Sequence, residues 1–422
     1  MPPEKNTNAE KRPGIFPTFF LSGFECSTFL WKDKGRRDLV AETQHMEFLD
    51  VDHGFLSSIG IAVTREGIPW PMGDRGGQYD FSGLDPLIDS LNRHKLLPIW
   101  DLCHYGYPDD LDPFSEAFPQ RFAAYARAAA EYVVPRLRCP HFFTPINEIT
   151  FFSYMAGEWG WAAPFGTTRE QRFRFREQLC RAAIAGAKAI REVDAEARMV
   201  HIDPLVNVVA PRDRPDLEEA AHHETYEDTF LAWDIIAGHK HPEHGGSPEI
   251  LDILGVNCYS FGQMEYREHG PPAALPPDDD RICPLGQLLA YASKRYGRPM
   301  IVGETSGLEG GRAAWLCDMV QEALAAVREG IDLHGVCLFP AADMPDWHTG
   351  KWVHNGLCDL VEVNGRLMRQ PSIPYVTELR RWQKILNRVT SLDEDPFSDP
   401  VDLADIEKAA QEMACSSDAN WF

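Results

Sequence analysis

The sequence of 422 residues contains no uncharged apolar stretch of about 18 residues, the length that a membrane-spanning helix needs. It is also poor in basic residues, since 41 lysines and arginines face 64 aspartates and glutamates, for a formal net charge of −23. So acidic a surface repels phosphate backbones and anionic lipids. We therefore expect neither nucleic acid nor a membrane among the partners, and a neutral small molecule as the ligand.

No two of the 10 cysteines form a C-x-x-C pair, which excludes a zinc ribbon and a thioredoxin-type redox pair. Cys103, Cys258 and Cys337 lie within apolar runs, where a free thiol behaves as a small core hydrophobe. Buried free thiols suit a reducing compartment, so we predict a cytoplasmic protein. An H-x-H-x-x-H run at residues 239–244 has no cysteine or suitably spaced carboxylate to complete a ligand set, and we interpret it as a solvated loop without metal.

The sequence lacks a G-x-G-x-x-G turn after its first strand, which disfavours the doubly wound dinucleotide-binding sheet. Short uninterrupted apolar runs instead alternate with amphipathic helical patterns about eight times along the chain. Uninterrupted runs are typical of strands buried on both faces, and the β-then-α order requires parallel strands with helical crossovers. We therefore predict an α/β protein with a single (β/α)8 TIM barrel.

The same patterns predict where the elements and domains lie. A polar tail is expected at 1–14, the barrel domain at 15–390 and an acidic C-terminal extension at 391–422. The segment Phe261–Pro284 is longer than a βα loop needs, so we expect elaborated loops on the barrel. Strands are expected at Thr18–Phe24, Ile59–Thr64, Leu96–Leu102, His141–Asn147, Met199–Asp203, Ile253–Tyr259, Met300–Glu304 and Gly335–Phe339, and helices at Leu84–His94, Phe118–Leu137, Arg172–Val193, His222–Ala237, Leu285–Tyr296, Ala313–Arg328 and Tyr375–Leu386.

Two glutamates follow predicted strands: Glu148 ends the fourth strand and Glu304 ends the seventh. Catalytic groups of a (β/α)8 barrel stand at the carboxyl ends of its strands, so we expect both side chains at the barrel mouth. A charge next to an apolar strand is costly unless it has a task or a partner. Glycoside hydrolysis requires such a pair, in which one acid protonates the leaving oxygen and one carboxylate attacks the anomeric carbon.

Neighbouring residues suit the same chemistry. Asn147 is a neutral donor and acceptor for a sugar hydroxyl beside the reacting carbon. Arg65 can keep the attacking carboxylate of Glu304 ionised, and Tyr259 can donate a hydrogen bond to it. Hydroxyl partners and stacking faces are expected from His104, Trp70, Trp159, Trp161 and Trp347.

Several short motifs, in the right order along the chain, resemble those of the family 1 β-glycosidases, retaining enzymes of a large (β/α)8 clan. Thr144–Glu148 resembles the acid/base motif of that family, and Ile301–Glu304 stands where the family has its nucleophile. The resemblance extends over roughly residues 18–385. Its other motifs are Phe19–Phe24, Leu102–Tyr105, Leu254–Tyr259, and Asp346–Trp347 with Asn355–Leu357.

This resemblance implies a retaining β-glycoside hydrolase that acts by double displacement from the ends of small glycosides or oligosaccharides. Glu148 would be its acid/base and Glu304 its nucleophile. The expected partner is a small-molecule carbohydrate, with no metal or organic cofactor, and a homo-oligomer is compatible with the sequence. The residues implied to bind the sugar are Arg65, His104, Tyr105, Asn147, Asn257, Tyr259 and Trp347.

The sequence departs from the family pattern around the sugar. Ile149 replaces a proline, and Thr305-Ser306 replaces Asn-Gly after the nucleophile. Glu25–Ser27 occupies the stretch that holds a sugar-binding glutamine, and Pro340–Asp343 stands in place of a Trp-Ser motif. The mechanism is therefore expected to carry over, whereas the sugar specificity is not. Two alternatives stay open, a non-hydrolytic carbohydrate-binding barrel and a transglycosidase that uses the same site.

Overall fold

The computed structural model describes residues 14–391, and the side chains of α12 as far as residue 387. The polar tail predicted at 1–14 and the acidic extension predicted at 391–422 thus lie outside the described residues but for one residue each. None of the described helices is long and apolar enough to cross a membrane. The nine cysteines in this part of the chain are free thiols, and Cys103, Cys258 and Cys337 are buried as predicted.

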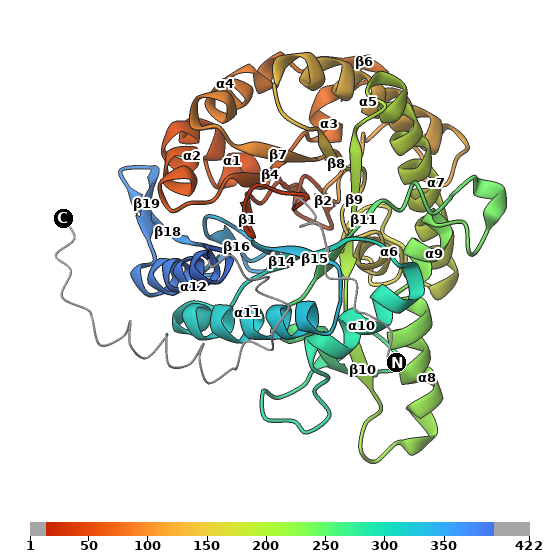
Figure 1. Ribbon diagram of the computed structural model, residues 1–422. Coiled ribbons are helices and arrows are strands. Elements are labelled where there is room, and N and C mark those ends of the chain that lie inside the picture. The colour runs from red at the N-terminus through yellow and green to blue at the C-terminus, as the bar shows by residue number, and fades with distance from the viewer. Residues whose placement is uncertain (1–13, 392–422) are drawn as a thin grey trace, which may run out of the picture.

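Parallel strands close into a barrel in the order β1-β15-β14-β11-β9-β8-β7-β4, which confirms the predicted (β/α)8 fold. Figure 1 shows these strands at the centre of the molecule, with helices around the outside. Each strand is the neighbour of the strand before it in the chain, and β1 closes the circle between β4 and β15. The strands are β1 (Phe20–Gly23), β4 (Val63–Gly67), β7 (Leu97–Asp101), β8 (Phe142–Thr144), β9 (Arg198–Pro204), β11 (Ile253–Asn257), β14 (Met300–Thr305) and β15 (Leu333–Leu338).

The helices that cover the barrel agree with most of the predicted ones. The sequence did not predict α1, α2, α3 or α6. The helix α6 is buried on nearly every side and therefore has no polar stripe in its sequence. The helices are α1 (Leu39–Glu42), α2 (Leu49–Ser58), α3 (Trp70–Gly73), α4 (Asp85–His94), α5 (Ala117–Val133), α6 (Ile149–Gly157), α7 (Arg169–Val193), α8 (Glu218–His223), α9 (Leu231–Ile236), α10 (Leu285–Tyr296), α11 (Arg312–Arg328) and α12 (Ile373–Ser391).

Several predicted boundaries differ from the structure, and two of the differences have a clear local reason. The second strand begins at Val63 rather than Ile59, because the backbone of Ile59 still bonds to Phe55 at the end of α2. The helix predicted at His222–Ala237 is divided into α8, a π-helical turn and α9. At that turn Thr229 donates to the carbonyl of Glu224 from both its backbone nitrogen and its hydroxyl, which widens the helix to an i+5 spacing.

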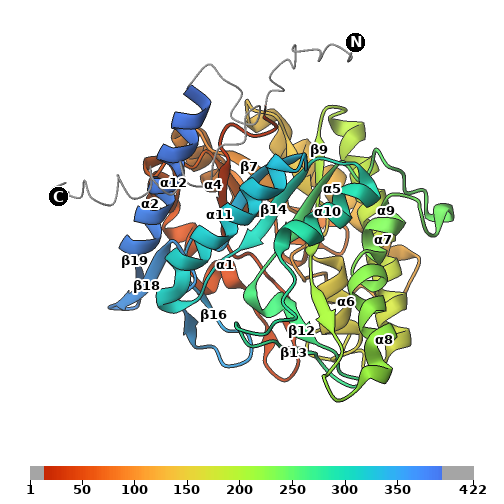
Figure 2. The ribbon, with the colours of Figure 1, turned by 60° about the horizontal axis from the view of Figure 1, so that its bottom comes forward.

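Small sheets outside the barrel are antiparallel, except that β10 pairs with β12 in parallel. The long segment after β11 is not a simple loop, because it supplies β12 and β13, which form a sheet with β10 from the segment after β9. Figure 2 shows β12, β13 and β16 along the same side of the molecule. These strands are β2 (Leu30–Trp31) with β3 (Gly35–Arg36), β5 (Asp74–Arg75) with β6 (Gln78–Tyr79), β10 (Asn207–Val209) with β12 (Gln263–Glu265) and β13 (Ala273–Ala274), β16 (Met344–Pro345) with β17 (Trp352–Val353), and β18 (Cys358–Val363) with β19 (Arg366–Pro371).

The interior of the barrel is apolar at one level and polar at the next. Successive side chains of a strand point to opposite faces, so Val63 and Arg65 share the inner face of β4, and Ile99 and Asp101 share that of β7. The apolar level is filled by buried residues that include Leu21, Val63, Ile99, Val200, Ile253 and Ile301. Polar groups at the carboxyl ends of the strands therefore rest on a packed apolar floor.

On the outer side of β4, Glu66 joins a buried network that ties α2 to the C-terminal hairpin. Its two oxygens lie 3.2 Å from Nε2 of His45 and 3.0 Å from Nε2 of His53. The other ring nitrogen of His45 lies 2.8 Å from Asp52, which in turn accepts from Arg369 of β19 at 2.8 Å. This network fixes the strand that carries Arg65.

We predict that His45 makes stability fall at alkaline pH. Burial alone would lower the pKa of His45, but the charge of Glu66 and the hydrogen bonds of both carboxylates raise it to about 9. A raised histidine pKa stabilises the fold fully below its usual value of about 6.5, and this contribution is lost as the pH rises through about 9. Urea unfolding at a series of pH values should show the free energy of unfolding falling over this range.

The matched comparison uses two histidine variants. The His45→Gln variant should lose most of this alkaline dependence, whereas His239→Gln, at an exposed histidine, should keep it. An unchanged dependence in the His45→Gln variant would contradict the assignment.

Candidate active site

The carboxyl ends of the strands bring the two predicted catalytic glutamates into one polar cluster. Glu304 belongs to β14 and is 5% exposed, and Glu148 precedes α6 and is 7% exposed. Asn257 of β11 is paired with Glu304 in the sheet and donates to Oε1 of Glu148 at 2.7 Å. One side chain thus links the strand of Glu304 to the carboxylate of Glu148.

Arg65 and Tyr259 hold the carboxylate of Glu304 from two sides, as the sequence led us to expect. Nη1 of Arg65 donates to Oε1 of Glu304 at 2.7 Å, and the hydroxyl of Tyr259 donates to Oε2 at 3.0 Å. Nη2 of Arg65 donates to Asp101 at 2.7 Å and to Oδ1 of Asn147 at 2.9 Å. Charge-assisted bonds of this kind stabilise a carboxylate anion in the orientation that they impose.

Glu148 lies in a different environment, because no arginine or lysine among the described residues forms an ion pair with it. Burial, and then the negative charge of Glu304, raise the pKa of Glu148 to about 8. Hydrogen bonds from the hydroxyl of Tyr105 and from Asn257 act in the opposite direction. The side chain is therefore mainly protonated at neutral pH, and its electrostatic interaction with Glu304 places the two carboxyl groups near each other.

His104 is held by protein groups at both ring nitrogens. Arg65 engages Oδ1 of Asn147, so the amide nitrogen of Asn147 points to Nε2 of His104 at 3.1 Å. Nδ1 of His104 lies 3.3 Å from the sulfur of Cys26 and 3.4 Å from Asp101. His104 is thus at the predicted site, and its role in sugar binding stays a prediction.

Cys26, Asp101 and His104 bring three potential metal-ligand atoms within 4.8 Å of one another, but their chemistry does not fit a metal ion. Burial raises the pKa of the Cys26 thiol to about 12, so the free thiol is protonated at neutral pH. The Asp101 oxygen nearest the cluster already accepts from the guanidinium of Arg65, whose positive charge disfavours a cation there.

The predicted aromatic residues divide into two groups. Trp347 lies at the site, with its ring centroid 5.5 Å from that of Tyr105, and its buried Nε1 donates to no other described residue. Trp159 and Trp161 pack on each other beside the same cluster. Trp70 was wrongly predicted as a stacking face, because it is fully buried in the outer core and bonds to Asp74.

Two carboxylates at the site were not predicted. Asp101 was recognisable only as a charge on the same strand face as Ile99. Glu25 follows β1, is 5% exposed, and accepts at Oε1 from the backbone nitrogen of Ser27 at 3.0 Å. Oε1 also lies 3.8 Å from Nε2 of His104, while Oε2 accepts no hydrogen bond within the described part of the chain. A charge inside an otherwise apolar run was the only sequence signal for Glu25.

The environment of Glu148 predicts an unusual titration. Carbon-13 spectra of protein labelled at the glutamate carboxyl groups should show Glu148 titrating near pH 8. In the Glu304→Gln variant the neighbouring charge is absent, so the pKa of Glu148 should fall by about one unit or more. An ordinary value near pH 4.3 in the unmodified protein would contradict this account of the site.

No protein-family model matches the sequence. Among solved structures, the chain is similar to a family 1 β-glucosidase from Thermotoga maritima, with a TM-score of 0.71 and 17% identity over 88% of this chain and 98% of that one. It is likewise similar to the AHE enzyme from Alicyclobacillus herbarius, with a TM-score of 0.72 and 17% identity over 89% and 100%. At this identity the likeness concerns the fold, and the chain has the (β/α)8 barrel architecture of those enzymes.

Proposed function

We propose that the protein is a retaining β-glycoside hydrolase that acts from the ends of small glycosides or oligosaccharides. The proposal rests chiefly on one observation, the contrast between the two glutamates. Glu304 is bonded to the guanidinium of Arg65, whereas Glu148 is buried without a cationic partner and has a pKa of about 8. One group is thus suited to attack and the other to give a proton at neutral pH.

In the first step, an oxygen of Glu304 forms a bond to the anomeric carbon while the bond from that carbon to the leaving oxygen breaks. Glu148 transfers its proton to the leaving oxygen, and the sugar remains as an ester of Glu304. Tyr259 and Arg65 orient the attacking carboxylate through the hydrogen bonds described above.

In the second step, Glu148 removes a proton from water while the water oxygen bonds to the anomeric carbon and the ester bond breaks. The charge of Glu304 explains how Glu148 can change from an acid to a base. The charge of Glu304 raises the pKa of Glu148, and ester formation removes that charge. Glu148 therefore becomes more acidic when it has to act as a base, and two inversions leave the configuration retained.

Structures with the same fold support a carbohydrate substrate. The β-glucosidase of Thermotoga maritima has been solved in complex with cyclophellitol and with glucoimidazole. Among the described residues, buried polar atoms without a protein partner at the site include Nε1 of Trp347 and Oδ1 of Asn257, and atoms of this kind are suited to bind sugar hydroxyls. The further residues that we propose for sugar binding are Arg65, His104, Tyr105, Asn147, Asn257 and Tyr259.

We expect Glu304→Ala to lower the turnover of a nitrophenyl β-glycoside by about 10⁴-fold or more, because the nucleophile is lost. Azide should restore turnover by entering the vacated space, which Arg65 makes attractive to an anion, and the product should be the glycosyl azide of inverted configuration. The control is Glu329→Ala, at an exposed glutamate, which should leave the rate unchanged. Full activity of Glu304→Ala would refute the nucleophile assignment.

A covalent label separates the hydrolase from a non-hydrolytic sugar-binding barrel. A 2-deoxy-2-fluoro glycoside with a good leaving group should add one sugar mass to the peptide that contains Glu304, because fluorine slows the second step. A binding barrel would give no labelled peptide. Products formed in the presence of an acceptor alcohol distinguish hydrolysis from transglycosylation.

The charges of the site favour neutral over anionic sugars. Arg65 is already bonded to Glu304 and Asp101, and the cation nearest to Glu25 among the described residues is His104, whose Nε2 lies 3.8 Å from Oε1, so carboxylates outnumber cations at the site. A screen of nitrophenyl glycosides should therefore give a kcat/KM for the best neutral sugar at least about tenfold above that for the glucuronide. Glu25→Gln should narrow this ratio, and a ratio that does not change would exclude Glu25 as its cause.

A further inference from the structure

Tyr105 makes a direct contact with Glu148 that the chemistry above does not require. The hydroxyl of Tyr105 donates to Oε2 of Glu148, while Asn257 donates to Oε1 at 2.7 Å. Both oxygens of the carboxyl group are thus engaged by side chains, each from a different strand end. Tyr105 also accepts at its hydroxyl from the amide of Asn147 at 3.3 Å, so its own orientation is fixed.

The backbone at both ends of this contact is left-handed. Tyr105 has a φ of 64° and Glu148 has a φ of 47°, a region that non-glycine residues seldom adopt. The turn at Tyr105 also requires Gly106, since a Cβ atom there would overlap the backbone oxygen of Thr28. Strained backbone of this kind persists where surrounding structure enforces it, and it is found preferentially at functional sites.

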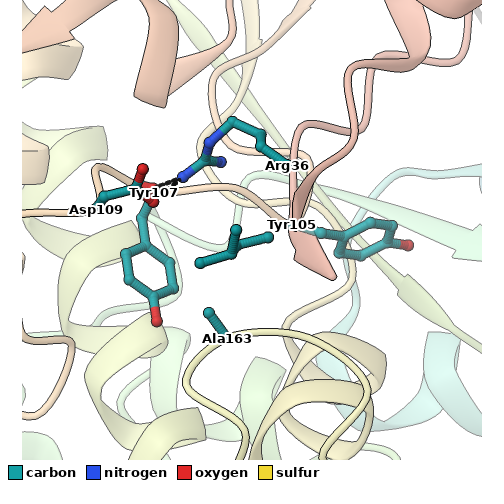
Figure 3. A pocket seen from close by; sticks show the side chains of 6 residues that line it. Arg36, Tyr105, Tyr107, Asp109 and Ala163 are labelled. Atoms are coloured by element: carbon teal, nitrogen blue, oxygen red, sulfur yellow. Dashed lines mark hydrogen bonds and ion pairs between the residues drawn. The ribbon is translucent and has the colours of Figure 1, made fainter. Parts of the chain in front are cut away.

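Aromatic rings on several sides fix the ring of Tyr105. Its centroid lies 5.5 Å from Trp347, 5.7 Å from Phe151 and 5.6 Å from Phe152, all at steep interplanar angles. Figure 3 shows Tyr105 and Tyr107 lining one small cavity with their rings pointing in different directions. The hydroxyl of Tyr105 is therefore directed to Glu148 by packing as well as by hydrogen bonds.

We propose that Tyr105 is a positioning residue for Glu148, whose hydroxyl holds the carboxyl group in place for proton transfer and stabilises the carboxylate that the second step needs. The proposal deepens the proposed hydrolase function and rests on it. The groups with a charge or proton that face Glu148 are Tyr105 after β7, Asp203 of β9, Tyr259 after β11 and Glu304 of β14. Only Tyr105 among them donates a hydrogen bond to Glu148.

The Tyr105→Phe variant removes that donor and keeps the ring. Because the bond favours the ionised form, the pKa of Glu148 should rise by about one unit. The alkaline limb of kcat/KM should then move to higher pH by the same amount. With an aryl glycoside whose leaving group is very good, the second step limits kcat. Because that step needs Glu148 as a base, kcat should fall more than kcat/KM.

The Tyr107→Phe variant is the matched control, because this tyrosine lines the same cavity and makes no side-chain contact with Glu148. It should leave the pH profile unchanged. If Tyr105→Phe does not fold, fluorotyrosine at position 105 gives a test of opposite sign. Burial raises the pKa of the phenol at position 105, which keeps the fluorotyrosine protonated. Because fluorotyrosine is a stronger hydrogen-bond donor than tyrosine, it should lower the pKa of Glu148 and move the alkaline limb to lower pH.

Direct carbon-13 titration of Glu148 in the Tyr105→Phe variant tests the proposal independently of turnover. A raised Glu148 pKa in a protein that cleaves no glycoside would uphold the contact and refute the proposed hydrolase. An unchanged pKa and a superimposable pH profile in a folded Tyr105→Phe variant would overturn the role of Tyr105.

Discussion

The buried guanidinium of Arg65 is the constraint on which the site depends. It is fully buried, rests against the ring of Phe339 at 4.8 Å, and is bonded to Asp101, Asn147 and Glu304. A charge in this position is tolerated only with such partners, and removing one from a buried pair costs about 3–5 kcal/mol. Through these bonds Arg65 fixes the orientation of the proposed nucleophile and, by way of Asn147, that of His104 and Tyr105.

The difference between the two glutamates follows from their distance to that cation. Glu304 shares a hydrogen bond with Arg65, while Glu148 is bonded only to the neutral donors Tyr105 and Asn257. Burial therefore stabilises the protonated form of Glu148, and the charge of Glu304 adds to this effect. The same charge links the two steps of the proposed reaction, because its disappearance changes the acidity of Glu148.

The residues that depart from the family pattern surround this central arrangement rather than interrupt it. Among them, Glu25 places an extra carboxylate beside His104. Tyr105 belongs to a motif that resembles the family, and its hydroxyl donates to Glu148. On the far side of β4, Glu66 and His45 form a second buried charge network that anchors the strand of Arg65 to α2. The hydrogen bonds that hold the two glutamates thus come from Arg65, Tyr259, Tyr105 and Asn257 and not from the departing residues.

The apolar rhythm of the sequence determined the barrel, because parallel strands covered by helices must be apolar on both faces. It also located the ends of β8 and β14 closely enough to predict Glu148 and Glu304 at the barrel mouth. The chemistry of the side chains at the strand ends predicted the contacts of Arg65 and Tyr259 with Glu304. Only the tertiary structure decided that Asp101 and Glu25 belong to the site and that Trp70 belongs to the core. These outcomes depend on side-chain direction and on left-handed turns such as that of Tyr105, and such features arise from packing between segments distant in the chain.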